Sequence, residues 1–254
     1  MKNTLIKIFG NWLDVLWGDT MVLDRYLWLR RNLPKTKNGE SLLDVGCGSG
    51  AFTIESAKRG YKATGISWDK ENQNNARKIA TILNIENQCL FPTGDARKLD
   101  ALVETEKYDY VINFENIEHI INDSKLIRDI FNTLKPGGVL LLTTPYLNYY
   151  PMSVGDLGPF SKVEDGGHVR RGYNRCMLNE LCELSGLKVE KIDYCSGIGS
   201  QFATKILRQA ISIFGYKIGW FITLPFRPLA FLLELLNFRG RPYSICLVAY
   251  KPRF

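Results

Sequence analysis

The sequence predicts an α/β fold in which a mostly parallel sheet is covered by helices on both faces. From residue 41 to residue 144, apolar segments of strand length alternate with segments of helical periodicity. At 42–50 an apolar strand ends in a glycine-rich turn, and a helix is expected at 51–58, which together make half of a βαβ unit. The 254 residues, 45% of them hydrophobic, are enough to bury one substantial core, so we expect a single domain over 1–254.

Within this domain we expect four consecutive segments. They are an N-terminal helical cap (1–36), a core (37–200), an apolar, basic helical insertion (201–243) and a last strand (244–254). Six apolar residues of the cap have near-helical spacing: Ile8, Trp12, Leu16, Leu23, Tyr26 and Leu27. This spacing predicts amphipathic helices that pack over the sheet edge carrying the glycine turn.

The glycine turn indicates a nucleotide-type cofactor. Gly46, Gly48 and Gly50 let the backbone approach a ligand where a Cβ would collide, and the N-terminus of the following helix faces the same space. A dinucleotide fingerprint is also met if Ala51 takes the third position, so the glycines alone leave the cofactor open. Asp44, inside the turn, is placed to hold the turn or to accept hydrogen bonds from a cationic amino-acid ligand.

Three further motifs follow in order. Lys62–Ile66 reads as a second strand, a third strand ends in Gly94-Asp95-Ala96, and the turn Lys135-Pro136-Gly137-Gly138 precedes a fifth strand at Val139–Thr144. With the glycine turn, this series resembles the class I S-adenosylmethionine (SAM) methyltransferases. The resemblance implies a Rossmann-like seven-stranded sheet whose last strand is antiparallel.

The resemblance also implies SAM as the methyl donor and a set of cofactor-binding positions. In the family, the carboxylate at Asp95 meets the adenine amino group. The implied positions are Asp44, Gly46, Cys47, Gly48, Gly50, Ser67, Trp68, Asp69, Asp95, Ala96 and Asn113. Ser67 stands where the family usually has an acid, so either Ser67 or Asp69 is expected at the ribose and Trp68 over the adenine. An N-cap for a helix starting near Lys70 and an ordinary packed indole are the alternatives.

Candidate catalytic residues follow the fourth predicted strand, Tyr108–Asn113. Glu115, Glu118 and His119 lie at its carboxyl end, the edge at which open α/β sheets bind ligands. In a helical turn these positions would share one face. The second of only two histidines, His168, lies in the Gly- and Pro-rich loop 145–172. Two carboxylates and two imidazoles suit a divalent ion such as Mg²⁺, Mn²⁺ or Zn²⁺.

The Glu-x-x-Glu-His pattern with a distant histidine is similar to that of the ubiquinone-pathway O-methyltransferases and the small-RNA terminal 2′-O-methyltransferases. This similarity implies an acceptor with two adjacent hydroxyls, gripped by a metal that lowers the pKa of one of them. Without metal, His168 or His119 is the natural general base. A purely structural role for the Glu-His pair and for His168 stays open beside both.

The insertion 201–243 is apolar and basic. Six basic residues face one acidic residue, Glu234, so this segment carries +5 of the chain's formal +7: Lys205, Arg208, Lys217, Arg227, Arg239 and Arg241. Because Lys217 and Pro225 interrupt the apolar run, we do not expect a membrane-spanning helix. The composition suits peripheral contact with an anionic membrane or a lid over a lipid-linked substrate. A helical hairpin on the sheet or a homodimer interface is the alternative.

Taken together, the motifs predict a SAM-dependent O-methyltransferase that acts on a lipophilic, lipid-linked or glycosyl small molecule with vicinal hydroxyls. A metal-free methyltransferase, an RNA 2′-O-methyltransferase and a non-catalytic binding module are the competing hypotheses. Nucleic acid is disfavoured because no basic tract with interleaved aromatics is present. Polar residues from Asn11 onward interrupt any signal-peptide core, so we expect a cytoplasmic protein, peripheral at the inner face of the membrane.

Overall fold

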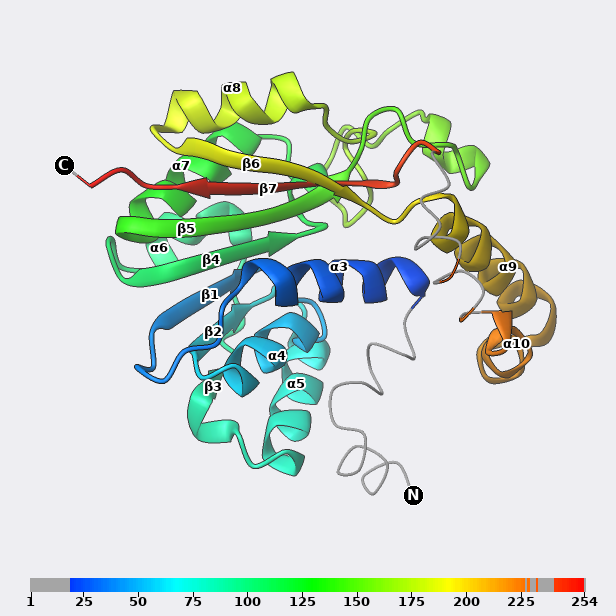
Figure 1. Ribbon diagram of the computed structural model, residues 1–254, viewed down its shortest axis with the longest axis horizontal. Coiled ribbons are helices and arrows are strands. Elements are labelled where there is room, and N and C mark those ends of the chain that lie inside the picture. Colours follow the sequence, from blue (N-terminus) through cyan, green and yellow to red (C-terminus); the bar gives the residue numbers. More distant parts are fainter. Residues whose placement is uncertain (1–18, 227, 229–231, 233–239, 254) are drawn as a thin grey trace.

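The computed structural model describes residues 19–226, 228, 232 and 240–253 and contains a seven-stranded sheet in the order β3-β2-β1-β4-β5-β7-β6 (Figure 1). The strands are β1 Ser41–Val45, β2 Lys62–Ile66, β3 Cys89–Leu90, β4 Tyr108–Phe114, β5 Leu134–Pro145, β6 Lys188–Cys195 and β7 Ser244–Tyr250. Strands β1 to β5 pair in parallel, and β7 is antiparallel to both β5 and β6. The Rossmann-like sheet with an antiparallel last strand is confirmed.

Helices cover both faces of this sheet (Figure 1). They are α3 Thr20–Asn32, α4 Ala51–Lys58, α5 Lys70–Ile82, α6 Leu99–Leu102, α7 Asp123–Thr133, α8 Arg175–Ser185, α9 Ile198–Phe214 and α10 Tyr216–Thr223. Alternate residues of one strand point to opposite faces, so Leu43 and Val45 enter the cluster beneath α6 to α8 while Leu42 enters the cluster beneath α3 to α5. Each face therefore has its own buried core.

Side-chain caps fix where several helices begin. Asp19, Asp69, Asn122 and Asn174 each accept a hydrogen bond from a backbone N–H in the first turn of α3, α5, α7 and α8. The caps hold helix starts close to the carboxyl ends of the strands. At that edge the strand order reverses between β1 and β4, which is where ligands bind in open α/β sheets.

The N-terminal cap differs from its prediction. Residues 1–18, including Ile8, Trp12 and Leu16, lie outside the described residues. In α3, Tyr26 is buried as expected, but Leu23 and Leu27 are only partly buried. The prediction of the buried face is therefore wrong: α3 turns Met21, Trp28 and Leu29 inward, because it packs on β5, β6 and α9 together.

The predicted turn at Lys135–Gly138 is also wrong in detail. The strand β5 already begins at Leu134, and the turn residues form an irregularity within it. Two β4 residues, Tyr108 and Tyr110, pair with Leu134 and Val139, so the extra residues bulge where Gly137 has φ +82°.

The first part of the predicted insertion is helical. Helices α9 and α10 form a hairpin beyond the N-terminal end of α3, as Figure 1 shows, and its turn is made by Gly215 at φ +77°. Residues 227, 229–231 and 233–239 lie outside the described part of the chain. Within the described part, no helix combines the length and apolar character needed to cross a membrane.

Candidate active site

The glycine turn between β1 and α4 needs its glycines for two different reasons. Gly46 has φ +78°, and a Cβ there would come within 2.4 Å of the Asn116 side chain. Gly48 has φ +51°, and a Cβ there would meet nothing within 4 Å. Gly46 therefore permits close packing of two loops, whereas Gly48 presents bare backbone to open space, as the predicted cofactor contact requires.

Asp44 lies beneath this turn, only 1% exposed, and its Oδ2 accepts a 2.6 Å hydrogen bond from Thr53 Oγ1 of α4. Burial raises the pKa of Asp44 to about 7, although the Thr53 hydrogen bond opposes the shift. Within the described part of the chain, no cation pairs with this carboxylate. A cationic ligand in the turn would supply it.

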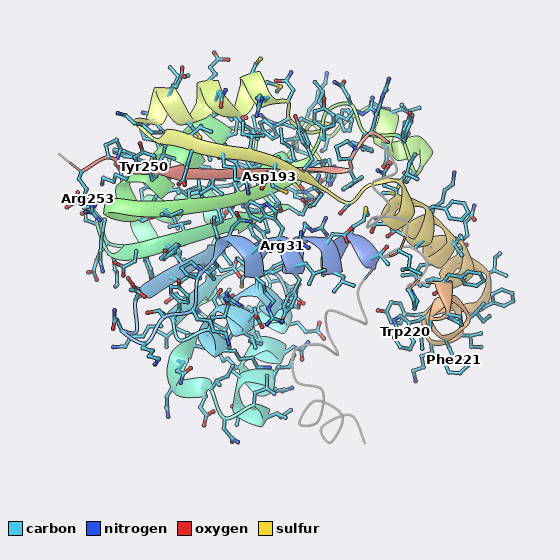
Figure 2. All side chains as sticks on the ribbon, in the orientation of Figure 1. Arg31, Asp193, Trp220, Phe221, Tyr250 and Arg253 are labelled. Atoms are coloured by element: carbon cyan, nitrogen blue, oxygen red, sulfur yellow. The ribbon has the colours of Figure 1, made fainter. Side chains whose placement is uncertain are left out.

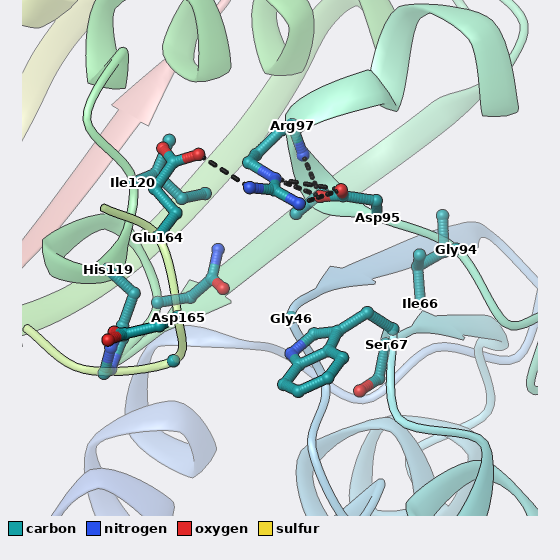
Figure 3. A pocket seen from close by; sticks show the side chains of 14 residues that line it. Gly46, Ile66, Ser67, Gly94, Asp95, Arg97, His119, Ile120, Glu164 and Asp165 are labelled. Carbon is teal, nitrogen blue, oxygen red and sulfur yellow. Dashed lines mark hydrogen bonds and ion pairs between the residues drawn. The ribbon is translucent and has the colours of Figure 1, made fainter.

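A cavity of about 340 Å³ opens beside the turn (Figure 3). The predicted residues that line it are Gly46, Ser67, Trp68, Asp95, Ala96 and His119. The remaining predicted cofactor positions do not line it: Asp44, Cys47, Gly48, Gly50, Asp69 and Asn113. Asn113 is fully buried and donates from Nδ2 to Val45 O at 3.0 Å, so it joins β4 to β1.

The two alternatives left open at the end of β2 have different outcomes. Asp69 accepts hydrogen bonds from the backbone N–H groups of Glu71 and Asn72, so the N-cap interpretation is confirmed for this residue. Trp68 is 71% exposed, so the packed-indole interpretation is wrong. The indole stands at the rim of the cavity, where an adenine has room to stack.

Asp95 is held by Arg97, a residue that sequence reasoning missed. Arg97 Nε lies 2.8 Å and 2.9 Å from the two Asp95 carboxylate oxygens, and Arg97 Nη1 lies 2.7 Å from Glu164 Oε2. The Arg97 hydrogen bond lowers the pKa of Asp95 below its ordinary value. Glu164 in turn accepts from Ile121 N at 2.6 Å. Figure 3 shows how Arg97 bridges Asp95 to the loop that carries Glu164 and Asp165.

A second missed residue is Asn116, which lines the cavity next to Gly46. Its Nδ2 is buried without a hydrogen-bond partner among the described residues. Buried donors are nearly always satisfied in folded proteins, so this amide is a candidate ligand contact. Its position directly after Glu115, in the segment that follows β4, was the signal available in the sequence.

Glu118, His119 and His168 come together as predicted. Each offers one candidate ligand atom, and within the described ranges these three atoms lie within 4.8 Å of one another. Glu118 is fully buried, and its Oε2 accepts from Thr144 Oγ1 at 3.0 Å, while His119 Nε2 lies 3.8 Å from Oε1. The two imidazole centroids are 4.7 Å apart and nearly perpendicular. Burial raises the pKa of Glu118, and burial followed by His119 lowers that of His168.

Glu115 stands apart from this group, which corrects the predicted four-residue cluster. The short helix is 3-10 rather than α and covers only Ile117–His119, and Glu115 precedes it with φ +48°. Its carboxylate lies 3.2 Å from Arg25 Nη1 and also accepts from Thr143 and Ser244. Because Arg25 arrives from α3, no local pattern around Glu115 revealed this ion pair.

A second cavity, of about 420 Å³, shares the lining residue Asp165 with the first. His168, Arg208 and Tyr243 are among its lining residues. His119 lines the first cavity, whereas His168 lines the second. Each cavity is therefore lined by one ring of the histidine pair, and the buried Glu118, which lines neither cavity, has a carboxylate oxygen within 4.8 Å of a nitrogen of both rings.

Comparison with known proteins adds the identity of the domain. The family model described as "Methyltransferase domain" matches residues 25–192. A ubiquinone biosynthesis O-methyltransferase of Aeromonas salmonicida is 31% identical over 157 residues, which cover 59% of this chain and 64% of that protein. Norajmaline N-methyltransferase of Rauvolfia serpentina is 32% identical over 129 residues, covering 50% of this chain and 43% of that protein. The chain thus spans less than two thirds of these relatives.

Solved structures agree with the fold. The [4+2]-cyclase SpnF superimposes with a TM-score of 0.63 at 21% identity, covering 92% of this chain and 83% of that one. A putative sarcosine dimethylglycine methyltransferase from Galdieria sulphuraria superimposes with a TM-score of 0.65 at 16% identity, covering 91% and 86%. These likenesses support the architecture, and the family match extends over α3 to β6. The chain belongs to the methyltransferase domain family.

Proposed function

We propose that the enzyme transfers the methyl group of SAM to a hydroxyl oxygen of a lipophilic, lipid-linked or glycosyl small molecule with two adjacent hydroxyls, a vicinal diol or catechol. The observation that carries this proposal is that His119 lines one cavity and His168 the other, with a carboxylate oxygen of Glu118 within 4.8 Å of both rings. A hydroxyl must lose its proton as it attacks a methyl group, so a site for hydroxyls needs proton acceptors at this place.

In this reaction SAM occupies the cavity beside the glycine turn, and the acceptor occupies the cavity lined by His168. Burial lowers the pKa of the His168 imidazole, which favours the neutral ring that can accept the hydroxyl proton. The acceptor oxygen then forms a bond to the methyl carbon while the carbon–sulfur bond of SAM breaks. The products are the methyl ether, neutral S-adenosylhomocysteine (SAH) and a protonated imidazole, which passes its proton to solvent.

Glu118, His119 and His168 also fit a divalent cation. Glu118 Oε1 is buried and lacks a hydrogen-bond partner among the residues described, and a cation would satisfy it. Glu118, His119 and His168 would hold the ion, which, when bound, acts as a Lewis acid and lowers the pKa of an acceptor hydroxyl. One carboxylate with two imidazoles suits Mn²⁺ or Zn²⁺ better than Mg²⁺, which prefers oxygen ligands.

The acceptor class rests on two supports. A relative 31% identical over 157 residues is named for O-methylation in ubiquinone biosynthesis. The second cavity also contains aromatic side chains, including Phe160 and Tyr243. The other lining residues are mostly polar, among them Asp156, Asp165 and Arg208, and rings beside polar groups suit an acceptor with a hydroxylated ring.

Product analysis with methyl-labelled SAM tests the proposal. We expect a catechol carrying an isoprenoid chain to be methylated on oxygen, and the matched monophenol to react more slowly. Glu118→Gln should lower kcat at least about a hundredfold while SAH affinity stays unchanged. The matched control is Glu104→Gln, whose side chain is 82% exposed, and it should leave both quantities unchanged.

Chelation separates the two versions of the mechanism. If EDTA abolishes transfer and Mn²⁺ or Zn²⁺ restores it, the metal-assisted version is supported. If EDTA has no effect but Glu118→Gln and His168→Gln remain inactive, the histidine acts without metal. Methyl transfer only to amine or carbon acceptors would overturn the O-methyltransferase proposal.

A further inference from the structure

The α9–α10 hairpin is packed on its inner side by small residues. Gly219 of α10 lies so close to α9 that a Cβ would come within 2.6 Å of Ile211 N. Near the start of α9, Thr20 Oγ1 of α3 lies 2.8 Å from Ser200 O and 3.0 Å from Thr204 Oγ1. The two helices of the hairpin thus pack against each other, and α9 is joined to α3. We call the side that faces away from these contacts the outer side.

That outer side is apolar. Five large hydrophobic residues of α9 and α10 are each more than half exposed: Phe202, Ile213, Phe214, Ile218 and Phe221. In Figure 2, Phe221 points away from the rest of the protein. Several large apolar side chains exposed on one hairpin indicate a site of interaction. We call these five residues, with Lys205 and Lys217, the α9–α10 surface.

The charges on this hairpin all have one sign. Residues 198–226 contain Lys205, Arg208 and Lys217 and no acidic residue. Arg208 Nη2 lies 4.0 Å from Oδ2 of Asp19, the residue just before α3, so the charge of Arg208 is partly balanced. Lys205 and Lys217 are exposed, and they give the apolar surface a net positive edge.

We propose that the α9–α10 surface docks on an anionic lipid bilayer, with its aromatic and aliphatic side chains inserted between the headgroups. Anionic headgroups attract lysines at the edge of such a surface while its apolar side enters the acyl boundary. A symmetric dimer through the same surface would bring two positively charged surfaces together with no acidic residue of 198–226 to balance them, which is unfavourable. The charge pattern therefore favours a membrane over a second copy of the chain.

Docking in this orientation also bears on the acceptor. Arg208 projects from α9 into the lining of the cavity that contains His168. The helix that meets the bilayer is therefore also a wall of the proposed acceptor cavity. A lipophilic acceptor dissolved in the membrane would therefore have only a short path from the bilayer to that cavity.

Vesicle co-sedimentation with the full chain tests the proposal, using phosphatidylcholine vesicles with and without phosphatidylglycerol. We expect binding to the anionic vesicles and weak binding to the neutral ones. The double variant Ile213→Asp and Phe221→Asp should lower the partition coefficient at least about tenfold, as should Lys205→Glu with Lys217→Glu. SAH binding by each variant reports that the fold is intact, and it needs no acceptor.

Matched controls place the same changes elsewhere. Leu184→Asp replaces an equally exposed apolar residue on α8, and Lys37→Glu with Lys188→Glu reverses two exposed lysines outside the hairpin. These variants should bind vesicles like the unchanged protein. Failure of the unchanged protein to bind anionic vesicles overturns the proposal, as does equal loss in the controls. A dimer that Phe221→Asp dissociates, without any vesicle binding, would assign the surface to a second copy instead. None of these outcomes depends on which atom is methylated.

Discussion

Replacing Asp44 by Asn should remove a specific pH dependence of stability. Asp44 is 1% exposed, and burial raises its pKa from 3.8 to about 7. The folded protein therefore binds a proton at this residue over a pH range in which the unfolded chain has already released it. Asn keeps the shape of the side chain, and its carbonyl still accepts from Thr53 Oγ1, but it does not titrate.

The sign and the size of the effect follow from proton linkage. Because the folded state binds the extra proton, its free energy of unfolding falls as the pH rises from about 4 to about 7, and then levels off. The shift from 3.8 to about 7 corresponds to about 4 kcal/mol. The stability of the unchanged protein minus that of Asp44→Asn should thus fall by up to about 4 kcal/mol between pH 4 and pH 8.

Urea unfolding at a series of pH values measures this difference directly. Asp100→Asn is the control with the opposite sign, since the hydrogen bond from Lys125 lowers the pKa of Asp100. Its carboxylate contributes stability above the ordinary pKa of Asp, and that contribution is lost as the pH falls. Parallel stability curves for Asp44→Asn and the unchanged protein would refute the assigned pKa and the reasoning from burial.

The same carboxylate should govern SAM binding if the SAM ammonium group lies in the glycine turn. The charged ligand then binds the ionised form of Asp44, so affinity should rise up to about tenfold per pH unit below pH 7. Calorimetry below pH 7 should detect proton release for the unchanged protein. Asp44→Asn should bind more weakly and release none, and equal release by both proteins would contradict this contact.

Four other single substitutions probe the site. A Cβ at Gly48 would face open space, so Gly48→Ala should cost about 1 kcal/mol of backbone strain and weaken SAH binding. Gly46→Ala should lower the melting temperature strongly, because its Cβ would meet the Asn116 side chain. Similar melting of both variants would contradict the packing. Arg25→Met should cost about 3–5 kcal/mol in urea unfolding by leaving the Glu115 carboxylate without its cation, and adding Glu115→Gln should restore much of it. Arg97→Met should lower the free energy of unfolding by less than about 1 kcal/mol, because the ion pairs of Arg97 are exposed. It should nevertheless speed amide exchange in the 161–168 loop. Unchanged exchange would show that Arg97 does not hold that loop.

The sequence predicted best what is decided locally. The predictions agree with the structure for the helices that start at Ala51 and Lys70 and for the last strand, Ser244–Tyr250. The hydrophobic period and the capping residues that indicate these elements lie within a few positions of one another in the sequence. The order of motifs likewise predicted the parallel sheet. His168 was placed correctly beside His119 because both were expected at the carboxyl edge of one sheet.

What the sequence did not predict depends on distant partners. Glu115 was assigned to a metal site, but Arg25 engages it from α3, 90 positions earlier in the chain. Arg97 pairs with Asp95 nearby and with Glu164 far away, so its bridge exists only in the folded protein. Asp69 offered both a cap and a ribose contact; the backbone geometry of α5 confirms the cap, and the ribose contact stays a prediction.

A crystal structure of the enzyme with SAH tests the central claim most directly. We predict adenine beside Trp68 and Asp95, and the sulfur at the end of the cavity that faces Glu118, His119 and His168. That position would aim a transferable methyl group at the second cavity. SAH bound with its sulfur turned away from these three residues, or outside the glycine turn, would contradict the account.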